Sequence, residues 1–179
     1  VVCVDKDASK VDLLNNHQVP IYEPELNAIV EKNVKAGRLT FTTDLKAGVK
    51  DVDAIFIAVG TPSRRGDGHA DLTYVFDAAK EVALAITEYT VIVTKSTVPV
   101  GTGDEIEAIF RQFCPKRCFD VISNPEFLRE GSAINDFMRP DRVVIGTTSE
   151  KAQDVMRNLY RPLFLIDTPI LFTARRTAE

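Results

Sequence analysis

Strand-like and helix-like segments alternate along almost the whole chain, and this alternation limits the possible folds more than any other feature. Short apolar runs such as Asp53–Val59, Tyr89–Thr94 and Phe119–Ser123 have the length and β-branched content of buried strands. Segments with helical spacing, such as Leu72–Ile86 and Gly103–Phe113, lie between them. Such alternation is typical of a mainly parallel sheet with helices on both faces. We therefore predict a doubly wound α/β fold.

The rest of the chain continues the pattern. Further strands are predicted at Val1–Val4, Arg38–Thr42, Arg142–Gly146 and Ile170–Thr173. Further helices are predicted at Ala8–Asn16, Pro24–Ala36, Leu45–Val49, Ser132–Phe137 and Ser149–Tyr160. Residues 60–71 contain three glycines and a proline, which indicates a loop. Residues 174–179 have the pattern of a helix cut off at its start, so we expect one α/β domain over residues 1–173.

Composition excludes several classes of function. The chain has 179 residues and a net charge of −4 from 22 basic and 26 acidic residues, so no positive field suggests a nucleic-acid or membrane-surface partner. The longest apolar runs have the length of strands and no secretory leader is visible, which favours a cytoplasmic protein. The three cysteines have no paired metal-type spacing, so we expect no metal site and three reduced thiols.

Asp5 ends the first predicted strand, a position from which an acidic residue can bind a dinucleotide cofactor. In a Rossmann βαβ unit a glycine-rich loop follows the first strand, and an acid about 20 residues later binds the adenosine ribose. Asp5 has the position of that acid, but only four residues precede it. We therefore expect a Rossmann-like sheet that lacks its central first strand and its glycine-rich loop, both upstream in a longer natural protein. Asp5 and Lys10 favour NAD over NADP, because recognition of the 2′-phosphate of NADP would be expected to use arginine instead. The alternative is a helix N-cap at Asp5 or Asp7 beside a solvated lysine.

Two loops at predicted strand ends combine small residues with hydroxyl groups. The motif GTPS at 60–63 would let a dinucleotide approach the backbone closely at Gly60. The motif KSTVPVGTG at 95–103 opens a helix whose amino terminus would favour an anion. Taken alone, each loop is explained equally well by an ordinary turn, with Thr102 as a helix cap.

The motif NPEFLREG at 124–131 directly follows the strand predicted at Phe119–Ser123. Ligands of open α/β sheets bind at the carboxyl ends of the strands, so Glu126 and Glu130 are candidates for a ligand site. One carboxylate is suited to act as a general base towards water, and the other to accept a hydrogen bond from a hydroxylated ligand. Neither has an obvious cation nearby except Arg129. The alternative is an exposed pair of carboxylates on a short turn.

The motifs follow one another in a fixed order: Val4-Asp5 with Lys10, then GTPS, KSTVPVGTG, SNPEFLREGSAINDF and PDRVVIG. In this order they resemble the UDP-glucose/GDP-mannose dehydrogenase family, and within it the UDP-glucose 6-dehydrogenases. The resemblance implies an amino-terminally truncated NAD-binding domain at 1–173 and the start of a central linking helix at 174–179. It implies a UDP-sugar-binding domain that this chain lacks, and a homo-oligomer formed through the central helix.

The resemblance also assigns roles to individual positions. It implies NAD contacts from Asp5, Lys10, Val59, Gly60, Thr61, Pro62, Ser63, Ser96, Thr97, Val98 and Glu130. It implies contacts with the UDP-sugar substrate from Glu126, Phe127, Leu128, Arg129 and Glu130. Thr97 and Glu126 would be the catalytic residues, because together they would hold the water of a hydrolytic step.

The reaction implied by the resemblance is the oxidation of UDP-glucose to UDP-glucuronate, a precursor for polysaccharide synthesis. Two NAD molecules accept hydride in succession, and a cysteine forms a thiohemiacetal and then a thioester that is hydrolysed. None of Cys3, Cys114 and Cys118 matches the nucleophile of the family, which lies beyond residue 179. We therefore expect this chain to be inactive by itself.

Other functions remain open at this point. A sister dehydrogenase could act on UDP-N-acetylmannosamine or GDP-mannose, because the missing half would read most of the base and sugar. A non-catalytic nucleotide-binding module or a pure interaction domain would also have this fold. Both are disfavoured because Thr97 and Glu126 are in place.

Overall fold

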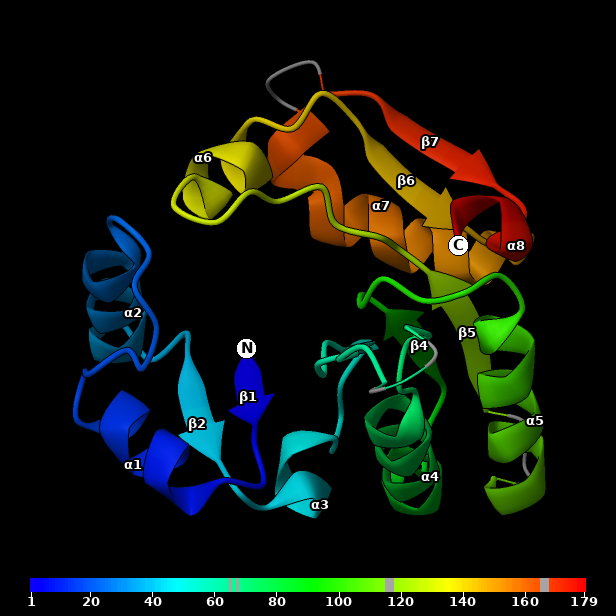
Figure 1. The fold of residues 1–179 in the computed structure, drawn as a ribbon, viewed down its shortest axis with the longest axis horizontal. Helices are drawn as coiled ribbons and strands as arrows, with labels where there is room; N and C mark the ends of the chain where they lie inside the picture. Colours follow the sequence, from blue (N-terminus) through cyan, green and yellow to red (C-terminus); the bar gives the residue numbers. More distant parts are fainter. Residues whose placement is uncertain (65, 67, 115–117, 165–167) are drawn as a thin grey trace. The chain divides into compact units, whose positions relative to one another are not determined.

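A computed structural model describes residues 1–64, 66, 68–114, 118–164 and 168–179 (Figure 1). Contacts within the chain divide it into two compact units. The first unit consists of Val1–Lys50 and Phe127–Pro140, and the second of Asp51–Glu126 and Asp141–Glu179. Each unit has its own sheet, and the two are described separately.

The second unit is built on a five-stranded sheet. Its strands lie in the order β3 (Ala54–Ile57), β4 (Thr90–Thr94), β5 (Phe119–Ser123), β6 (Val143–Gly146) and β7 (Ile170–Thr173). Every neighbouring pair is parallel except β5 and β6. The predicted mainly parallel sheet is therefore confirmed for this unit.

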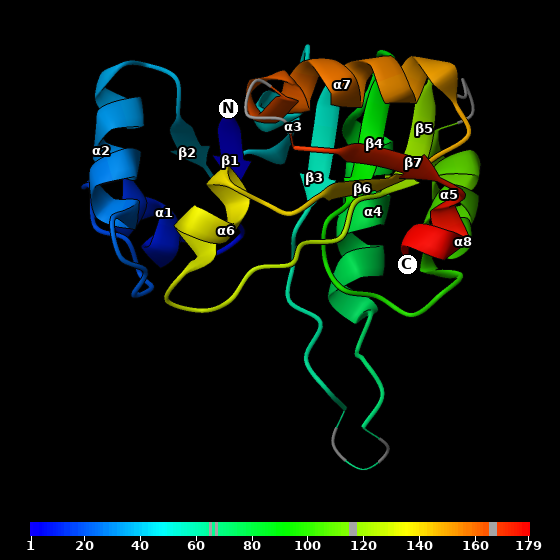
Figure 2. The same cartoon turned by 90° about the horizontal axis from the view of Figure 1, so that it is seen from above.

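Helices cover both faces of this sheet (Figures 1 and 2). Val91 and Val93 of β4 pack in one apolar cluster with Met156 of α7 (Glu150–Phe164). Successive side chains of a strand point to opposite faces, so Ile92 faces the other side, which α4 (Thr73–Ala85) and α5 (Thr102–Phe113) cover. All five residues of β4 are buried, as expected for the central part of a doubly wound fold.

The end of the second unit packs closely on β6. The short helix α8 (Arg175–Ala178) contacts β6, and a Cβ atom added to Gly146 would lie 2.6 Å from the Ala178 Cβ and 2.8 Å from the Arg175 Cα. Real Cβ atoms do not come that close to backbone, so only glycine fits where α8 crosses the strand.

The first unit contains a two-stranded parallel sheet, in which β1 (Val2–Val4) pairs with β2 (Thr40–Thr42). Its helices are α1 (Ala8–Asn15), α2 (Leu26–Lys35), α3 (Leu45–Gly48) and α6 (Ala133–Met138). Among the described strands, β1 pairs only with β2 and β3 only with β4. The presence of an additional strand upstream of Val1 and the extent of the domain stay predictions.

Each strand and helix expected from the sequence is present, with ends that differ by only a few residues. The loop at 60–71 contains an isolated bridge between Ser63 and Ala70, and residues 65 and 67 of this loop lie outside the described residues. Among the described helices, none is both long and apolar enough to span a membrane. Cys3, Cys114 and Cys118 are all free thiols, and the sulfurs of Cys114 and Cys118 are 3.3 Å apart.

Candidate functional site

The carboxyl ends of β3, β4 and β5 lie at the same end of the second unit's sheet, because these three strands are parallel. Backbone hydrogen bonds between neighbouring segments continue just beyond the ends of these strands. The Lys95 amide donates to the Ile57 carbonyl at 2.9 Å, and the Asn124 amide donates to the Thr94 carbonyl at 2.9 Å. The three loops that carry the predicted site residues of this unit therefore leave the sheet side by side.

Two side-chain hydrogen bonds join the loop after β3 to the loop after β4. The Ser96 hydroxyl donates to the Val59 carbonyl at 2.7 Å, and the Thr61 hydroxyl donates to the Thr97 carbonyl at 3.3 Å. Four of the predicted cofactor-binding residues are thus brought together. A Cβ atom at Gly60 would meet nothing within 4 Å, so the backbone there is open to a ligand, as the motif predicts.

The remaining predicted residues of these loops differ in exposure. Thr97 is exposed, which leaves it accessible to a ligand. Pro62 and Ser63 are exposed on the outer part of their loop. Val98 is buried, so its side chain belongs to the packing of the second unit, and only its backbone is suited to the predicted role.

Asn124, the first residue after β5, is the centre of a buried hydrogen-bond network. Its side chain is 1% exposed, and its amide nitrogen donates to the Val144 carbonyl at 2.8 Å. Its Oδ1 accepts from the Tyr160 hydroxyl at 2.6 Å and from the Lys95 ammonium at 3.4 Å. Burial raises the pKa of Tyr160 to about 12, so this phenol remains a donor at neutral pH.

Lys95 is a partly buried cation whose hydrogen bonds reach the two residues before Glu126. Its ammonium also donates to the Pro125 carbonyl at 3.5 Å. Burial lowers the pKa of Lys95, and the charge of Glu126 partly opposes that shift. Glu126 itself is half-buried, and its Oε2 is buried without a hydrogen-bond partner among the described residues.

In the sequence, Arg129 is the only obvious cation near these two carboxylates. Arg129 pairs instead with Asp136, through Nη2 to Oδ1 at 2.7 Å and through Nε to Oδ2 at 3.1 Å. Sequence reasoning missed Lys95, Asn124 and Tyr160 as site residues. Lys95 and Asn124 lie inside the quoted motifs, so their position after a strand was the available signal, but nothing in the sequence pointed to Tyr160.

KSTVPVGTG opens helix α5, as predicted, but the alternative in which Thr102 caps this helix is not found. Its N-cap is Gly101 in a left-handed conformation, and the Thr102 hydroxyl donates to the Pro99 carbonyl at 2.6 Å. The two carboxylate oxygens of Glu179 accept from the Gly101 amide at 2.6 Å and the Gly103 amide at 2.7 Å. The anion that the helix terminus favours is thus supplied by the chain itself.

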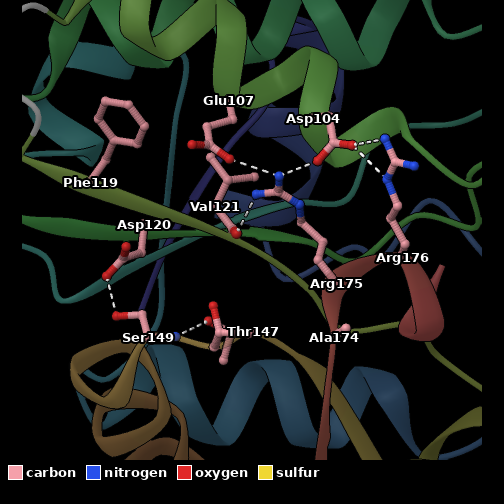
Figure 3. A pocket seen from close by; sticks show the side chains of 11 residues that line it. Asp104, Glu107, Phe119, Asp120, Val121, Thr147, Ser149, Ala174, Arg175 and Arg176 are labelled. Carbon is pink, nitrogen blue, oxygen red and sulfur yellow. Dashed lines mark hydrogen bonds and ion pairs between the residues drawn. The ribbon is translucent and has the colours of Figure 1, made fainter.

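A pocket in the second unit lies around Arg175, apart from the predicted site residues (Figure 3). The Arg175 guanidinium donates to the Val121 carbonyl at 3.0 Å and to both Asp104 and Glu107. Arg176 pairs with Asp104 as well, at 2.8 Å. Because the guanidinium of Arg175 is neutralised by two carboxylates, this pocket has the character of a structural ion-pair cluster.

The ion-pair cluster makes the second unit sensitive to acid. Hydrogen bonds from Arg175 and Arg176 lower the pKa of Asp104. Burial alone would raise the pKa of Glu107, but the hydrogen bond and charge of Arg175 outweigh it and lower that pKa. A lowered folded-state pKa stabilises the protein above the unfolded value of about 4, and this contribution is lost as pH falls through the folded value.

We therefore expect Arg175→Met to lower the thermal unfolding midpoint at pH 7 by more than at pH 3. The comparison requires four measurements, of the unsubstituted protein and the variant at each pH. Arg157→Met is the matched control, because it removes an exposed ion pair with Asp154 on α7. An effect of Arg175→Met that is equal at both pH values would contradict the assignment.

In the first unit, the predicted ribose-binding acid is separate from the helix cap. Asp7 is the N-cap of α1 and accepts from the Ser9 and Lys10 amides. Asp5 accepts from the Asp7 amide at 2.9 Å through Oδ1, and its Oδ2 lies 3.8 Å from the Lys10 ammonium. The N-cap alternative is therefore correct for Asp7 and not for Asp5. Asp5 directly follows β1, and its second carboxylate oxygen faces the Lys10 ammonium.

The predicted substrate segment Phe127–Glu130 belongs to the first unit, whereas Glu126 belongs to the second. Phe127 is 57% exposed and Glu130 is exposed. Both carboxylate oxygens of Glu23 hold the end of this segment, since they accept from the Gly131 amide at 2.9 Å and the Ala133 amide at 2.8 Å. Glu23 was also missed from the sequence, because 108 residues separate it from Gly131.

Replacing Glu23 by Gln is expected to loosen this segment. A neutral amide has a single acceptor oxygen, so one of the two charge-assisted hydrogen bonds is lost and the other is weakened. Hydrogen exchange at the Gly131 and Ala133 amides should accelerate by about 10-fold or more. Glu25→Gln is the control, since the Glu25 carboxylate accepts no such bond in the described part of the chain, and equal exchange in both variants would show that Glu23 does not hold the segment.

Comparison with known proteins identifies relatives of the whole chain. The family described as "UDP-glucose/GDP-mannose dehydrogenase family, NAD binding domain" matches residues 1–164. UDP-glucose 6-dehydrogenase of Rhizobium meliloti is 59% identical over all of this chain, which corresponds to 41% of that protein. UDP-glucose 6-dehydrogenase TuaD of Bacillus subtilis is 50% identical over all of this chain and 38% of its own length.

Solved structures of dehydrogenases have the same fold. A ternary complex of GDP-mannose dehydrogenase from Pseudomonas aeruginosa matches with a TM-score of 0.93 and 37% identity, over 99% of this chain and 42% of that one. UDP-glucose dehydrogenase from Pyrobaculum islandicum also gives a TM-score of 0.93, with 40% identity over 99% of this chain and 41% of that one. The expected Rossmann-like fold is thereby confirmed, and the chain spans about two-fifths of the length of these relatives.

Proposed function

Because this chain belongs to the UDP-glucose/GDP-mannose dehydrogenase family, as an NAD-binding domain, we propose that it is the NAD-binding part of a UDP-glucose 6-dehydrogenase. The observation that carries this proposal is the 59% identity with UDP-glucose 6-dehydrogenase of Rhizobium meliloti over the whole chain. The complete enzyme would oxidise UDP-glucose to UDP-glucuronate with two equivalents of NAD. Residues 174–179 would begin the helix that leads to the UDP-sugar-binding domain and forms the homo-oligomer of a cytoplasmic enzyme.

Features within each unit support the proposed NAD contacts. Asp5 directs a carboxylate oxygen towards Lys10 at the end of β1, where it would hold the adenosine ribose. Gly60 leaves open space beside the backbone, and the hydrogen bonds of Ser96 and Thr61 fix the loops that would line the nicotinamide end. NAD, when bound, supplies the acceptor of hydride.

Residues of the second unit would catalyse the hydrolytic step. Glu126 would take a proton from water held with the help of Thr97, and the water oxygen would attack the carbonyl carbon of a cysteine thioester. The bond from carbon to sulfur then breaks, which releases the carboxylate product and the thiolate. By the family resemblance, none of Cys3, Cys114 and Cys118 would be this cysteine. We therefore propose that a nucleophile outside this chain forms the thioester and that this chain alone is inactive.

A sister activity on GDP-mannose is the second candidate, because GDP-mannose dehydrogenase from Pseudomonas aeruginosa matches with the same TM-score as UDP-glucose dehydrogenase from Pyrobaculum islandicum. The shared fold therefore does not separate the two substrates. The higher sequence identity of the UDP-glucose 6-dehydrogenases of Rhizobium meliloti and Bacillus subtilis favours UDP-glucose.

NADH formation by the complete enzyme with a panel of nucleotide sugars tests the proposal. We expect kcat/KM to be highest for UDP-glucose and lower for UDP-N-acetylmannosamine and GDP-mannose, with two NADH formed per sugar. A higher kcat/KM for another sugar would reassign the substrate. NAD binding in calorimetry without any turnover would instead favour a non-catalytic nucleotide-binding module.

A further inference from the structure

Cys114 and Cys118 form a pair of thiols in the second unit, outside the candidate site. Helix α5 ends at Cys114, and Cys118 directly precedes β5. Their sulfur atoms lie 3.3 Å apart, and neither is in a disulfide. Cys3, the third cysteine of the chain, belongs to the first unit and is exposed. Two nucleophilic sulfur atoms of the second unit therefore already face each other.

The packing of α5 on β5 holds the two cysteines together. The Cys114 amide donates to the Phe110 carbonyl at 2.7 Å, and the Cys118 carbonyl accepts from the Thr90 amide of β4 at 3.0 Å. The ring of Phe110, which is fully buried, lies 5.1 Å from the ring of Phe119, measured between centroids. Both cysteines are thus attached to elements that the core fixes, so the contact between their sulfurs is a property of the folded unit.

The two thiols differ in their access to solvent. Cys114 is 5% exposed, whereas Cys118 is half-buried. A small molecule in solution can therefore reach the Cys118 sulfur more easily than the Cys114 sulfur. An accessible thiol in contact with a second thiol is the usual arrangement of a pair that is oxidised in two steps, because the second thiol resolves the product of the first.

We propose that Cys114 and Cys118 are a reversible oxidation site, which exchanges with small disulfides such as oxidised glutathione and closes into an intrachain disulfide. The Cys118 thiolate attacks one sulfur of the small disulfide, which forms a mixed disulfide and releases one thiolate. The Cys114 thiolate then attacks the Cys118 sulfur, which forms the bond between the two cysteines and releases the second thiolate. The protons of the two cysteines pass to the two released thiolates, so one disulfide is reduced while another forms.

Forming this bond requires only a small movement. The sulfurs of a disulfide are about 2.05 Å apart, so those of the pair, now 3.3 Å apart, must approach by about 1.3 Å. The candidate site follows the carboxyl ends of β3, β4 and β5, whereas Cys118 precedes the amino end of β5. The inference therefore does not depend on the proposed function. Disulfides of cytoplasmic proteins are usually transient, so a reversible bond suits the proposed location.

Equilibration of the complete enzyme with reduced and oxidised glutathione tests the proposal. Free thiols are then alkylated after an acid quench, and the protein is digested with trypsin. Trypsin cuts after Lys116 and Arg117, between the two cysteines, so the bond appears as peptides 112–116 and 118–129 joined together. Burial raises the pKa of Cys118, so little thiolate is present at neutral pH and the products are measured at equilibrium rather than as a rate.

Cys3 is the internal reference, because it is exposed and can form only a mixed disulfide with glutathione unless two molecules are joined. For the pair, Cys114 competes with free glutathione at a high effective concentration. At about 1 mM reduced glutathione, the linked-to-reduced ratio of the pair should exceed the mixed-to-reduced ratio of Cys3 by about 10-fold or more. Glutathione attached to Cys118 without linked peptides would overturn the proposal.

Two serine variants identify the order of attack. Cys114→Ser should stop at the mixed disulfide on Cys118, to about the same extent as Cys3. Cys118→Ser should leave Cys114 largely unmodified, because the sulfur of Cys114 is buried. If Cys114 instead carries more glutathione in its variant than Cys118 does in the other, the assigned order of attack is wrong.

The same glutathione mixture in guanidinium chloride separates the fold from the sequence spacing. The unfolded chain keeps four residues between the start and end of the pair but loses the packing of α5 on β5. The linked fraction should therefore fall by about 10-fold, and the bond would stabilise the folded state by the same factor. Equal linked fractions in folded and unfolded protein would show that the spacing alone makes the bond, and the inference would fail. Both measurements use the unsubstituted protein, so they hold even if a serine variant does not fold.

Discussion

Replacing Glu126 by Gln in the complete enzyme is expected to slow hydrolysis of the acyl-enzyme by roughly 10²- to 10⁴-fold, the usual contribution of a general base. Gln has nearly the same shape as Glu but takes no proton from water. The steps before hydrolysis do not need this base, so they should proceed at nearly normal rates. The enzyme should then accumulate with the sugar covalently attached.

Intact-mass spectrometry of the enzyme after rapid mixing with UDP-glucose and NAD would detect that accumulation directly. Glu130→Gln is the matched control, because Glu130 is an exposed carboxylate four residues away. The predicted role of Glu130 is a ligand contact, so its loss should raise KM and leave the thioester short-lived. An unmodified Glu126→Gln enzyme that turns over normally would remove Glu126 from the hydrolytic step.

Much of the second unit's site could be predicted from sequence, because a periodic pattern locates strand ends. The strands β3, β4 and β5, which end at Ile57, Thr94 and Ser123, are parallel neighbours in the structure, so the loops after them leave the same end of the sheet. The same reasoning placed Asp5 at the end of β1. Local sequence patterns of this kind predict which residues follow each strand. The parallel arrangement of the strands then brings these residues to the same edge of the sheet.

The parts that could not be predicted depend on contacts between residues far apart in the chain. Tyr160 reads as one more apolar position of an amphipathic helix, and only the structure shows that its hydroxyl meets Asn124 across 36 residues. Glu179 caps α5 across 76 residues, where the sequence suggested Thr102. In both cases a polar side chain satisfies a buried or terminal group that has several possible partners, and hydrophobic periodicity carries no information about the choice.

The same buried network predicts a large effect on stability when Asn124 is replaced by Leu. The substitution keeps the approximate volume but removes one hydrogen-bond partner from each of three groups: the Tyr160 hydroxyl, the Lys95 ammonium and the Val144 carbonyl. Each lost hydrogen bond costs about 1 kcal/mol, and a buried group left unsatisfied costs more, so we expect a loss of about 3 kcal/mol or more. Amides of β4 and β5 in the complete protein should then exchange hydrogen about 100-fold faster or more.

Thr94→Val, in the strand beside Asn124, is expected to act in the opposite direction. Thr94 is fully buried, and its Oγ1 has no hydrogen-bond partner in the described part of the chain. Val has the same shape and no hydroxyl, so the substitution removes a desolvation penalty and should stabilise β4 by about 1 kcal/mol. Slower exchange of the β4 amides would show this gain. The two substitutions differ mainly in the hydrogen-bond partners that they leave behind. If both change hydrogen exchange by the same amount and in the same direction, hydrogen-bond satisfaction does not determine the stability of these strand ends.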